Sequence, residues 1–250
     1  MKSGIKRNKQ KHLNGYVLFL LTGRRHKAMN LRHEWKHEIN AADILLLRQR
    51  LRAVMQTDVN AVNGKYEIRS LYFDNAADKV LMEKINGVKI REKFRIRYYN
   101  GNTSRILLEK KSKFNGLGRK ESAVLTKDEA QAIADGEYNW MAVHNHALIR
   151  ELHTKMLTQG LRPKTIVDYT REPFVYGPGN VRVTIDYHIR TGLGCVDFLN
   201  PDCITVPAGD QAAVLEVKWD AFLPDIIRDI VQLKGRHTTA FSKYQVCRII

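Results

Sequence analysis

One short segment of the chain has the spacing of a charged β-strand. Every second position is cationic, at Lys89, Arg91, Lys93, Arg95 and Arg97. The positions between them are mostly apolar, with Ile90, Phe94 and Ile96 beside Glu92. Because successive side chains of a strand point to opposite faces, such a strand has one cationic face and one largely apolar face. Like charges on one face repel each other, so this face would be stabilised by a bound anion.

Other strand-like segments place acidic and basic groups together on one face. They contain Arg32, Glu34 and Lys36; Glu109 and Lys111; Arg182, Thr184 and Asp186; and Glu216 and Lys218. An ordinary solvated sheet surface would explain one charged strand, but these four together with the cationic strand favour an anion-binding site.

The carboxylates narrow the choice of anion. A nucleic-acid groove combines cations with stacking aromatic rings, and carboxylates on the same face would weaken it. Carboxylate oxygens instead suit Mg²⁺ or Mn²⁺, which also bind phosphate oxygens. The pattern therefore predicts a chain of phosphates bound together with a divalent metal. No GxxxxGK[ST] motif occurs, so P-loop chemistry is not indicated.

The elements that position these residues are predicted to form one antiparallel α+β domain. Helical spacing or capping signals indicate helices over 41–56, 126–136, 147–158 and 224–235. Period-two patterns indicate eight strands, over 31–38, 65–73, 88–99, 104–111, 119–125, 164–171, 180–189 and 212–219. If the charged faces turn inward and the helices cover the apolar outside, the sheet closes into a β-barrel tunnel with flanking helices.

Composition sets the class of protein. The 250 residues carry a net charge of +16 and are 44% hydrophobic, which describes a folded, basic protein. No apolar run is long enough to cross a bilayer, so no transmembrane segment is predicted. The three cysteines form no CxxC pair, which indicates neither a disulfide framework nor a zinc ribbon and favours a reducing, cytoplasmic location.

The first 28 residues form a separate basic extension. They carry eight Lys and Arg residues and no acid, which is half of the net charge. Two interpretations stay open: Met29 is the biological start of a domain over 29–250, or the extension is an arm that binds anionic lipid or nucleic acid.

Nine motifs, in order along the chain, resemble the signatures of the vacuolar transporter chaperone (VTC) domain. They are RHEWK (32–36), SLYFDN (70–75), FRIRYY (94–99), LLEKK (107–111), GLGRK (116–120), DYTREPF (168–174), VRVTID (181–186), LEVK (215–218) and FSKY (241–244). The resemblance covers about residues 30–248. It implies a triphosphate tunnel metalloenzyme, whose fold is a closed antiparallel β-tunnel. It also implies a polyphosphate polymerase that transfers the γ-phosphate of ATP to a growing polyphosphate chain, using Mn²⁺ or Mg²⁺.

The resemblance also implies roles for individual residues. The catalytic cations would be Lys36, Arg95, Arg97, Lys111 and Arg182. The substrate-binding cations would be Lys120, Arg171, Lys218, Lys243 and either Lys84 or Lys89. Glu216 matches the metal-binding glutamate, and Glu34, Glu109 and Asp186 are further acidic candidates. Wider relatives open with ExExK, whereas this chain has Arg32 at the first of these acidic positions, so one metal ligand is lost or supplied elsewhere.

Three alternative functions stay open. If water accepts the phosphoryl group, the same site is a triphosphatase, with Glu34 as the suspected general base. A polyphosphate- or nucleotide-binding module would keep the cations without turnover. An RNA-binding domain would stack bases on Tyr72, Tyr98 and Tyr99, although the neighbours of these tyrosines are typical of barrel-wall packing. The sequence does not indicate an oligomeric state.

Overall fold

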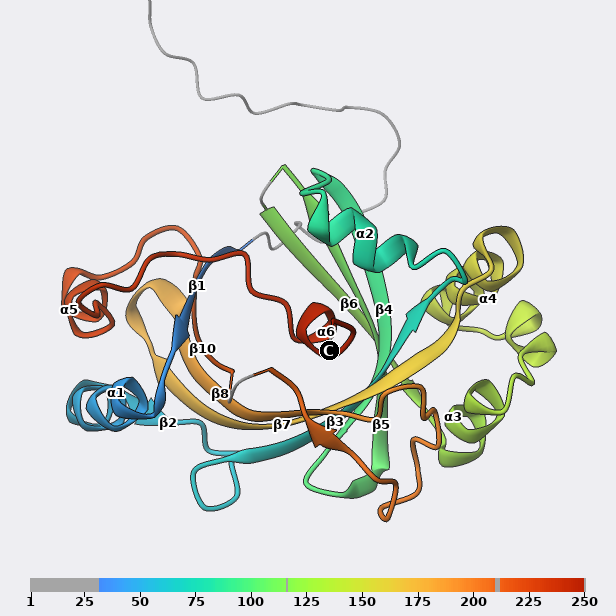
Figure 1. The fold of residues 1–250 in the computed structure, drawn as a ribbon, viewed down its shortest axis with the longest axis horizontal. Coiled ribbons are helices and arrows are strands. Elements are labelled where there is room, and N and C mark those ends of the chain that lie inside the picture. The colour runs from blue at the N-terminus through green and yellow to red at the C-terminus, as the bar shows by residue number, and fades with distance from the viewer. Residues whose placement is uncertain (1–31, 116, 210–211, 250) are drawn as a thin grey trace, which may run out of the picture.

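The computed structural model describes residues 32–249, except 116, 210 and 211. One strongly curved, ten-stranded sheet dominates it, and all of its strand pairs are antiparallel. The strand order is β1 (His33–Ile39), β10 (Ala213–Trp219), β8 (Val181–Thr191), β7 (Arg162–Tyr176), β3 (Tyr66–Asp74), β4 (Ile90–Tyr99), β5 (Asn102–Phe114) and β6 (Leu117–Leu125). Two short strands lie off this path: β2 (Gln56–Thr57) pairs with β7, and β9 (Val206–Pro207) pairs with β8. Figure 1 shows the sheet as a cup with β1 on one wall and β6 on the other.

The expected closed barrel is not confirmed, because β1 and β6 form no continuous ladder. The two edge strands approach each other at one isolated antiparallel bridge, between Arg32 and Gly118. Farther along, the free edge of β1 is paired with the segment that precedes the C-terminus. His37 bridges Thr238 there, and the Thr239 amide donates to the Lys36 carbonyl at 2.8 Å.

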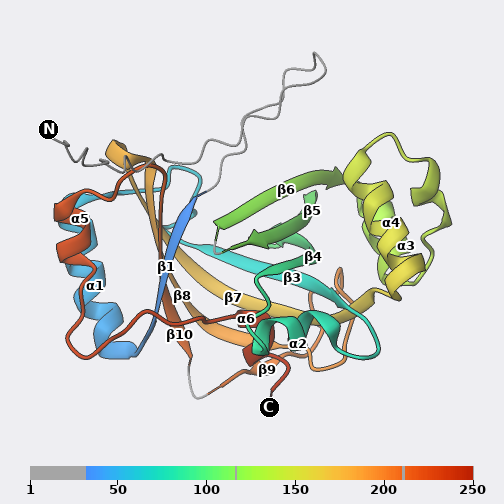
Figure 2. The ribbon, with the colours of Figure 1, turned by 90° about the horizontal axis from the view of Figure 1, so that it is seen from above.

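The helices at the two ends of the sheet lie outside the cup, whereas the helix that precedes β4 and the C-terminal helix lie against its concave side (Figures 1 and 2). They are α1 (Ala41–Val54), α2 (Lys79–Ile85), α3 (Lys127–Ala134), α4 (Ala147–Gln159), α5 (Asp225–Ile230) and α6 (Lys243–Val246), with 3₁₀ turns at Asn139–Val143 and Pro178–Asn180. Capping boxes begin α1 at Asn40 and α3 at Thr126. Gly160 ends α4 in the left-handed region, with φ of 67°. These three helices match the predicted positions.

The expected helix over 224–235 is too long. Helix α5 stops at Ile230, because the chain must turn there to reach the edge of β1, where Thr238 is bridged. From that edge it enters the concave side of the sheet and forms α6, next to the C-terminus in Figure 1.

Two apolar clusters hold α1, α3 and α4 on the convex side. In one, Leu47 and Leu51 of α1 pack against Val183 and Leu215 of the sheet. The larger cluster joins α3 and α4 to the strands from β3 to β7. Among the described residues, no helix has the length and apolar character needed to span a bilayer.

The alternation along β4 sets the direction of its charged side chains. Phe94, Ile96 and Tyr98 are buried in the larger apolar cluster. Their neighbours Arg95 and Arg97 therefore face the concave side, as the period-two pattern predicted. This strand is the source of the strongest concentration of charge in the cup.

Candidate functional site

The concave side of the sheet encloses a cavity of about 1370 Å³. Its lining residues come from the main sheet strands, from α2 and from the segment over 238–244. Sixteen of the lining side chains are Lys or Arg, and only five are Asp or Glu. Such an excess of cations around one cavity creates a strongly positive potential that attracts anions.

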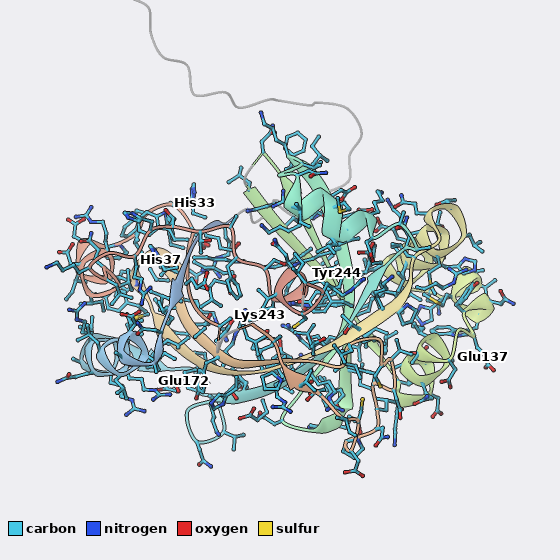
Figure 3. The ribbon with its side chains drawn as sticks, viewed as in Figure 1. His33, His37, Glu137, Glu172, Lys243 and Tyr244 are labelled. Carbon is cyan, nitrogen blue, oxygen red and sulfur yellow. The ribbon has the colours of Figure 1, made fainter. Side chains whose placement is uncertain are left out.

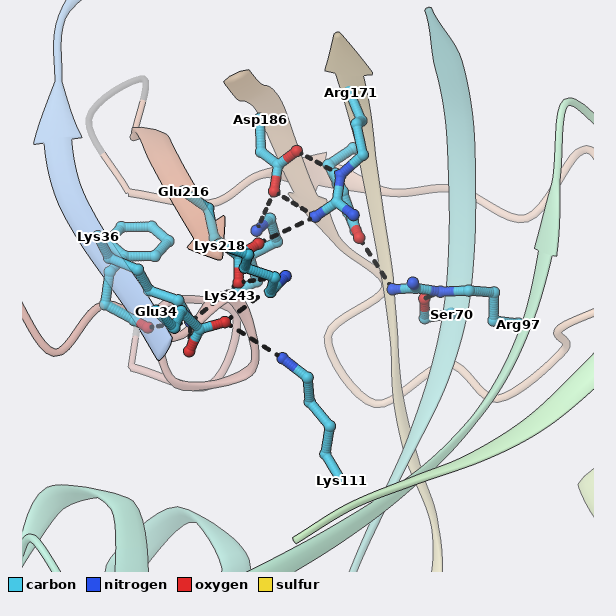
Figure 4. A network of polar contacts seen from close by, with 12 residues as sticks. Glu34, Lys36, Ser70, Arg97, Lys111, Arg171, Asp186, Glu216, Lys218 and Lys243 are labelled. Atoms are coloured by element: carbon cyan, nitrogen blue, oxygen red, sulfur yellow. Dashed lines mark hydrogen bonds and ion pairs between the residues drawn. The ribbon is translucent and has the colours of Figure 1, made fainter. Parts of the chain in front are cut away.

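Two glutamates of neighbouring strands share their lysine partners. Lys36 Nζ lies 3.5 Å from Glu34 Oε2 and 3.7 Å from Glu216 Oε1. Lys218 Nζ lies 3.6 Å from Glu34 Oε1 and 2.9 Å from Glu216 Oε1. Lys111 reaches across from β5 to Glu34 Oε1 at 3.6 Å. We call these five residues the glutamate–lysine cluster; Figure 4 shows them at the centre of the network.

Burial and charge oppose each other in this cluster. Burial would raise the pKa of Glu216, but Lys218 and Lys36 hold it well below the usual range. Burial lowers the pKa of Lys218 to about 8, in spite of the nearby Glu216. The pKa of Lys36 is raised, because Glu216 and Glu34 together outweigh the effect of burial. Lys218 therefore loses its proton in the mildly alkaline range.

A second group surrounds Asp186, which lies behind the cavity wall. Asp186 is fully buried and accepts two hydrogen bonds from Arg171, each at 2.7 Å. Lys243 of α6 places its Nζ 2.5 Å from the same carboxylate. Arg171 also lies 3.4 Å from Glu216, which connects this group to the glutamate–lysine cluster. Asp186 thus positions two cations, and Figure 3 shows Lys243 inside the concavity.

A third group surrounds Glu109 on β5, which is 1% exposed. Arg95 Nη2 lies 2.6 Å, Lys120 Nζ 3.0 Å and Arg97 Nη1 3.7 Å from its carboxylate. Burial would raise the pKa of Glu109, but Arg95 and Arg97 hold it far below the usual range. Glu109 remains ionised and fixes the arginines against the wall.

Hydroxyl groups fix the arginines further. Arg97 donates to Ser70 Oγ at 3.1 Å and to Tyr169 Oη at 2.8 Å. Arg95 donates to Tyr72 Oη at 2.8 Å. Guanidinium groups held in this way lose little side-chain entropy when a phosphate binds.

Lys93 belongs to the predicted cationic face but is not among the predicted site residues. Its Nζ lies 5.5 Å from the centroid of the Tyr72 ring, and no described carboxylate forms an ion pair with it. Burial lowers the pKa of Lys93 to about 7. Burial would raise the pKa of Tyr72, but the neighbouring Arg95 and Lys93 lower it. The regular alternation of β4 was the signal that would have identified Lys93.

Most of the predicted site residues line this cavity. The cations are Lys36, Lys84, Arg95, Arg97, Lys111, Lys120, Arg171, Arg182, Lys218 and Lys243, and the acids are Glu34, Glu109 and Glu216. Of the two alternatives Lys84 and Lys89, only Lys84 lines the cavity. Lys89 is exposed and lies outside it. Asp186 lies beneath the lining, and Arg182 pairs with Asp58 at 2.7 Å. The first position of the ExExK-like motif is not acidic here, because Arg32 lies there and pairs with Asp220 at 2.8 Å.

The acidic residues fit a metal that is bound jointly with phosphate. Within the described part of the chain, no group of three or more His, Cys, Asp or Glu residues comes together. Mg²⁺ commonly uses one or two carboxylates and takes its other ligands from phosphate and water. Glu34 and Glu216 supply such a pair, since both contact Lys36 and Lys218. Glu109 and Asp186 are less suitable, because a guanidinium group lies 2.6 Å from the first and 2.7 Å from the second, against 3.4 Å for Arg171 and Glu216.

The curved antiparallel sheet and its cationic cavity define an α+β protein suited to holding an extended polyanion. The chain belongs to the VTC domain family, whose family model matches residues 31–249. The resemblance drawn from the nine motifs is thereby confirmed. Family membership and the charge of the cavity support a function that involves triphosphate or polyphosphate.

The solved structures that are similar to this chain are distant from it in sequence. The PH1012 protein from Pyrococcus horikoshii OT3 is 13% identical, with a TM-score of 0.45 over 87% of this chain and 99% of that one. The PH1819 protein from the same organism is also 13% identical, with a TM-score of 0.41 over 80% of this chain and 84% of that one. No curated protein matches the chain.

Proposed function

We propose that the protein is a polyphosphate polymerase that transfers the γ-phosphate of ATP to the end of a polyphosphate chain. The observation that carries this proposal is the cavity, where sixteen Lys and Arg side chains face five carboxylates in a member of the VTC family. A chain of phosphates is the anion that neutralises cations spread over so long a surface. ATP and polyphosphate are therefore the proposed partners.

Phosphoryl transfer makes little covalent demand on a protein, so positioning and charge supply most of the acceleration. Arg95, Arg97 and Arg171 present planar guanidinium groups that are fixed by carboxylates or hydroxyls. They would bind phosphate oxygens in a bidentate manner. Lys36 and Lys218, on β1 and β10, and Lys111, on β5, would act as point charges. Together these residues would hold the donor phosphate in line with its acceptor.

Glu34 and Glu216 are the residues that would hold Mg²⁺ or Mn²⁺. Such an ion supplies Lewis-acid stabilisation of charge on the phosphate oxygens. Lys36 and Lys218 each contact both carboxylates and would hold these two side chains in position. Glu34 would then bind the metal and would not act as a general base for water. This arrangement supports transfer to a phosphate acceptor over hydrolysis.

The test is a product assay with the full chain. Purified protein is incubated with ATP and Mn²⁺, with and without a short polyphosphate primer, and the products are resolved by gel and by a free-phosphate assay. We expect long chains and ADP, with a shorter lag when primer is present. Orthophosphate without chains would establish a triphosphatase instead. Tight triphosphate binding without either product would establish a binding module.

A further inference from the structure

Two of the three cysteines meet in the loop that joins β8 to β9. Their spacing, with seven residues between them, did not indicate a pair in the sequence. In the structure, Cys195 Sγ and Cys203 Sγ lie 2.8 Å apart, and both residues are partly exposed. The third, Cys247, is buried and lies against the Arg190 carbonyl. The loop lies on the far side of the sheet from the cationic cavity, and neither thiol lines that cavity.

The loop holds the two thiols together through contacts on both sides. The Cys195 amide donates to the Gly192 carbonyl at 2.8 Å, and the Cys203 amide donates to the Asn200 carbonyl at 3.3 Å. Between the cysteines, the Asn200 carbonyl accepts a hydrogen bond from Arg69 at 2.6 Å. Phe198 is 1% exposed, and its ring packs on Tyr98. Because the segment between the thiols is anchored to β3 and β4, their proximity belongs to the folded state.

We infer that Cys195 and Cys203 form a reversible intramolecular disulfide, with a low-molecular-weight disulfide such as glutathione disulfide as the oxidant. The Cys195 thiolate attacks one sulfur of the oxidant, forms a mixed disulfide and releases one thiolate. Cys203 then loses its proton, and its sulfur attacks Cys195 Sγ and releases the second thiolate. The two protons pass to the two released thiolates, so that two protein thiols are oxidised and one disulfide is reduced to two thiols.

The order of attack follows from the environments of the two thiols. Burial and the neighbouring Cys195 raise the pKa of Cys203 to about 11. Cys203 therefore stays protonated near neutral pH and suits the resolving role, while Cys195 makes the first attack. The disulfide would restrict the unfolded chain, so the oxidised protein should melt at a higher temperature than the reduced protein.

The test uses the full chain treated with glutathione disulfide under native conditions and then alkylated. No Lys or Arg lies between Thr191 and Lys218, so trypsin leaves Cys195 and Cys203 in one peptide, while Cys247 falls in a second peptide, residues 244–248. We expect the first peptide to be two hydrogens lighter and unalkylated, and the second to be unmodified or alkylated. Reductant should restore both thiols of the first peptide.

Variants separate this pairing from general thiol reactivity. Cys203→Ser should trap a glutathione adduct on Cys195, whereas Cys247→Ser should form the internal disulfide as the parent does. Separate glutathione adducts on both cysteines, a linkage that includes Cys247, or no change in the folded protein would each overturn the inference. None of these outcomes bears on the polymerase proposal, which is tested by its own products.

Discussion

Glu216 and Lys218 lie two positions apart on β10, and both face the cavity with 2.9 Å between Oε1 and Nζ. The pair keeps a carboxylate and an ammonium group ionised beside each other in a largely buried wall. Burial still lowers the pKa of Lys218 to about 8. The charge of this wall therefore depends on pH in the range where the protein would be assayed.

Triphosphate binding should weaken as the pH rises from about 7 to about 9. Burial lowers the pKa of Lys93 to about 7 and that of Lys218 to about 8, so both lose positive charge over this range. Isothermal titration calorimetry at constant ionic strength should show a falling affinity. Measurements in two buffers of different ionisation enthalpy should also show proton uptake on binding at pH 8. An affinity that rises or stays constant would contradict the assignment of these lysines to the site.

Replacing Lys93 with Met should weaken triphosphate binding and stabilise the ligand-free protein. Met has a similar length and removes a partly buried charge that has no carboxylate partner among the described residues. The pKa of Lys93 is about 7 in the folded protein against 10.5 for an ordinary lysine, so the unfolded chain binds more protons between these values. The gain in stability should be complete below pH 7 and fade toward pH 10.5.

Thermal unfolding of Lys93→Met at pH 6 and at pH 10 checks this sign. Lys127→Met, on the exposed first turn of α3, is the matched control and should change neither stability nor binding. A Lys93→Met variant that is destabilised at pH 6 would show that this lysine has a structural partner.

Arg97→Lys and Glu216→Gln should each lower turnover by about a hundredfold, the usual size of the loss of one electrostatic group. Lys cannot reproduce the bonds that Arg97 makes to Ser70 and Tyr169, and Gln cannot balance Lys36 and Lys218. Initial rates of ADP formation measure the effect, and circular dichroism checks folding. Arg228→Ala, on the outer helix α5, should keep the parent rate. Near-normal rates in both site variants would refute the site assignment.

Tyr244→Phe should loosen the C-terminal helix. Tyr244 Oη donates to Asp74 Oδ2 at 2.7 Å, and the Asp74 carboxylate also accepts from the amides of Val80 and Leu81 at the start of α2. Loss of this hydroxyl should lower the free energy of unfolding by about 1–2 kcal/mol. Urea denaturation measures it, with Tyr176→Phe as the control. An unchanged midpoint would show that α6 is held by packing alone.

The sequence predicted those parts of the fold that local patterns determine. The capping signals at Asn40 and Thr126 located two helices, and the alternation along β4 gave the direction of Arg95 and Arg97. Helices α2 and α6 were missed, because seven and four residues are too few for a helical period to appear.

Contacts between distant segments were beyond prediction. Alternation shows which face a residue occupies but not whether a neighbouring side chain covers it, so Asp186 and Glu109 could not be distinguished from the exposed acids. Lys89, the end of the cationic run, lies outside the cavity because it precedes β4, in the connection from α2, and does not share the alternation of the strand. Whether the sheet closes depends on how β1 and β6 meet, and the sequence pattern of neither strand indicates this.

The edge of β1 has a consequence for how copies of the chain meet each other. An edge strand with free amides and carbonyls is a template on which another molecule can add a strand. Here Arg32 is bridged to Gly118 near one end, and Lys36 and His37 are engaged by Thr239 and Thr238 near the other. The C-terminal segment thus covers part of this edge and opposes edge-to-edge aggregation.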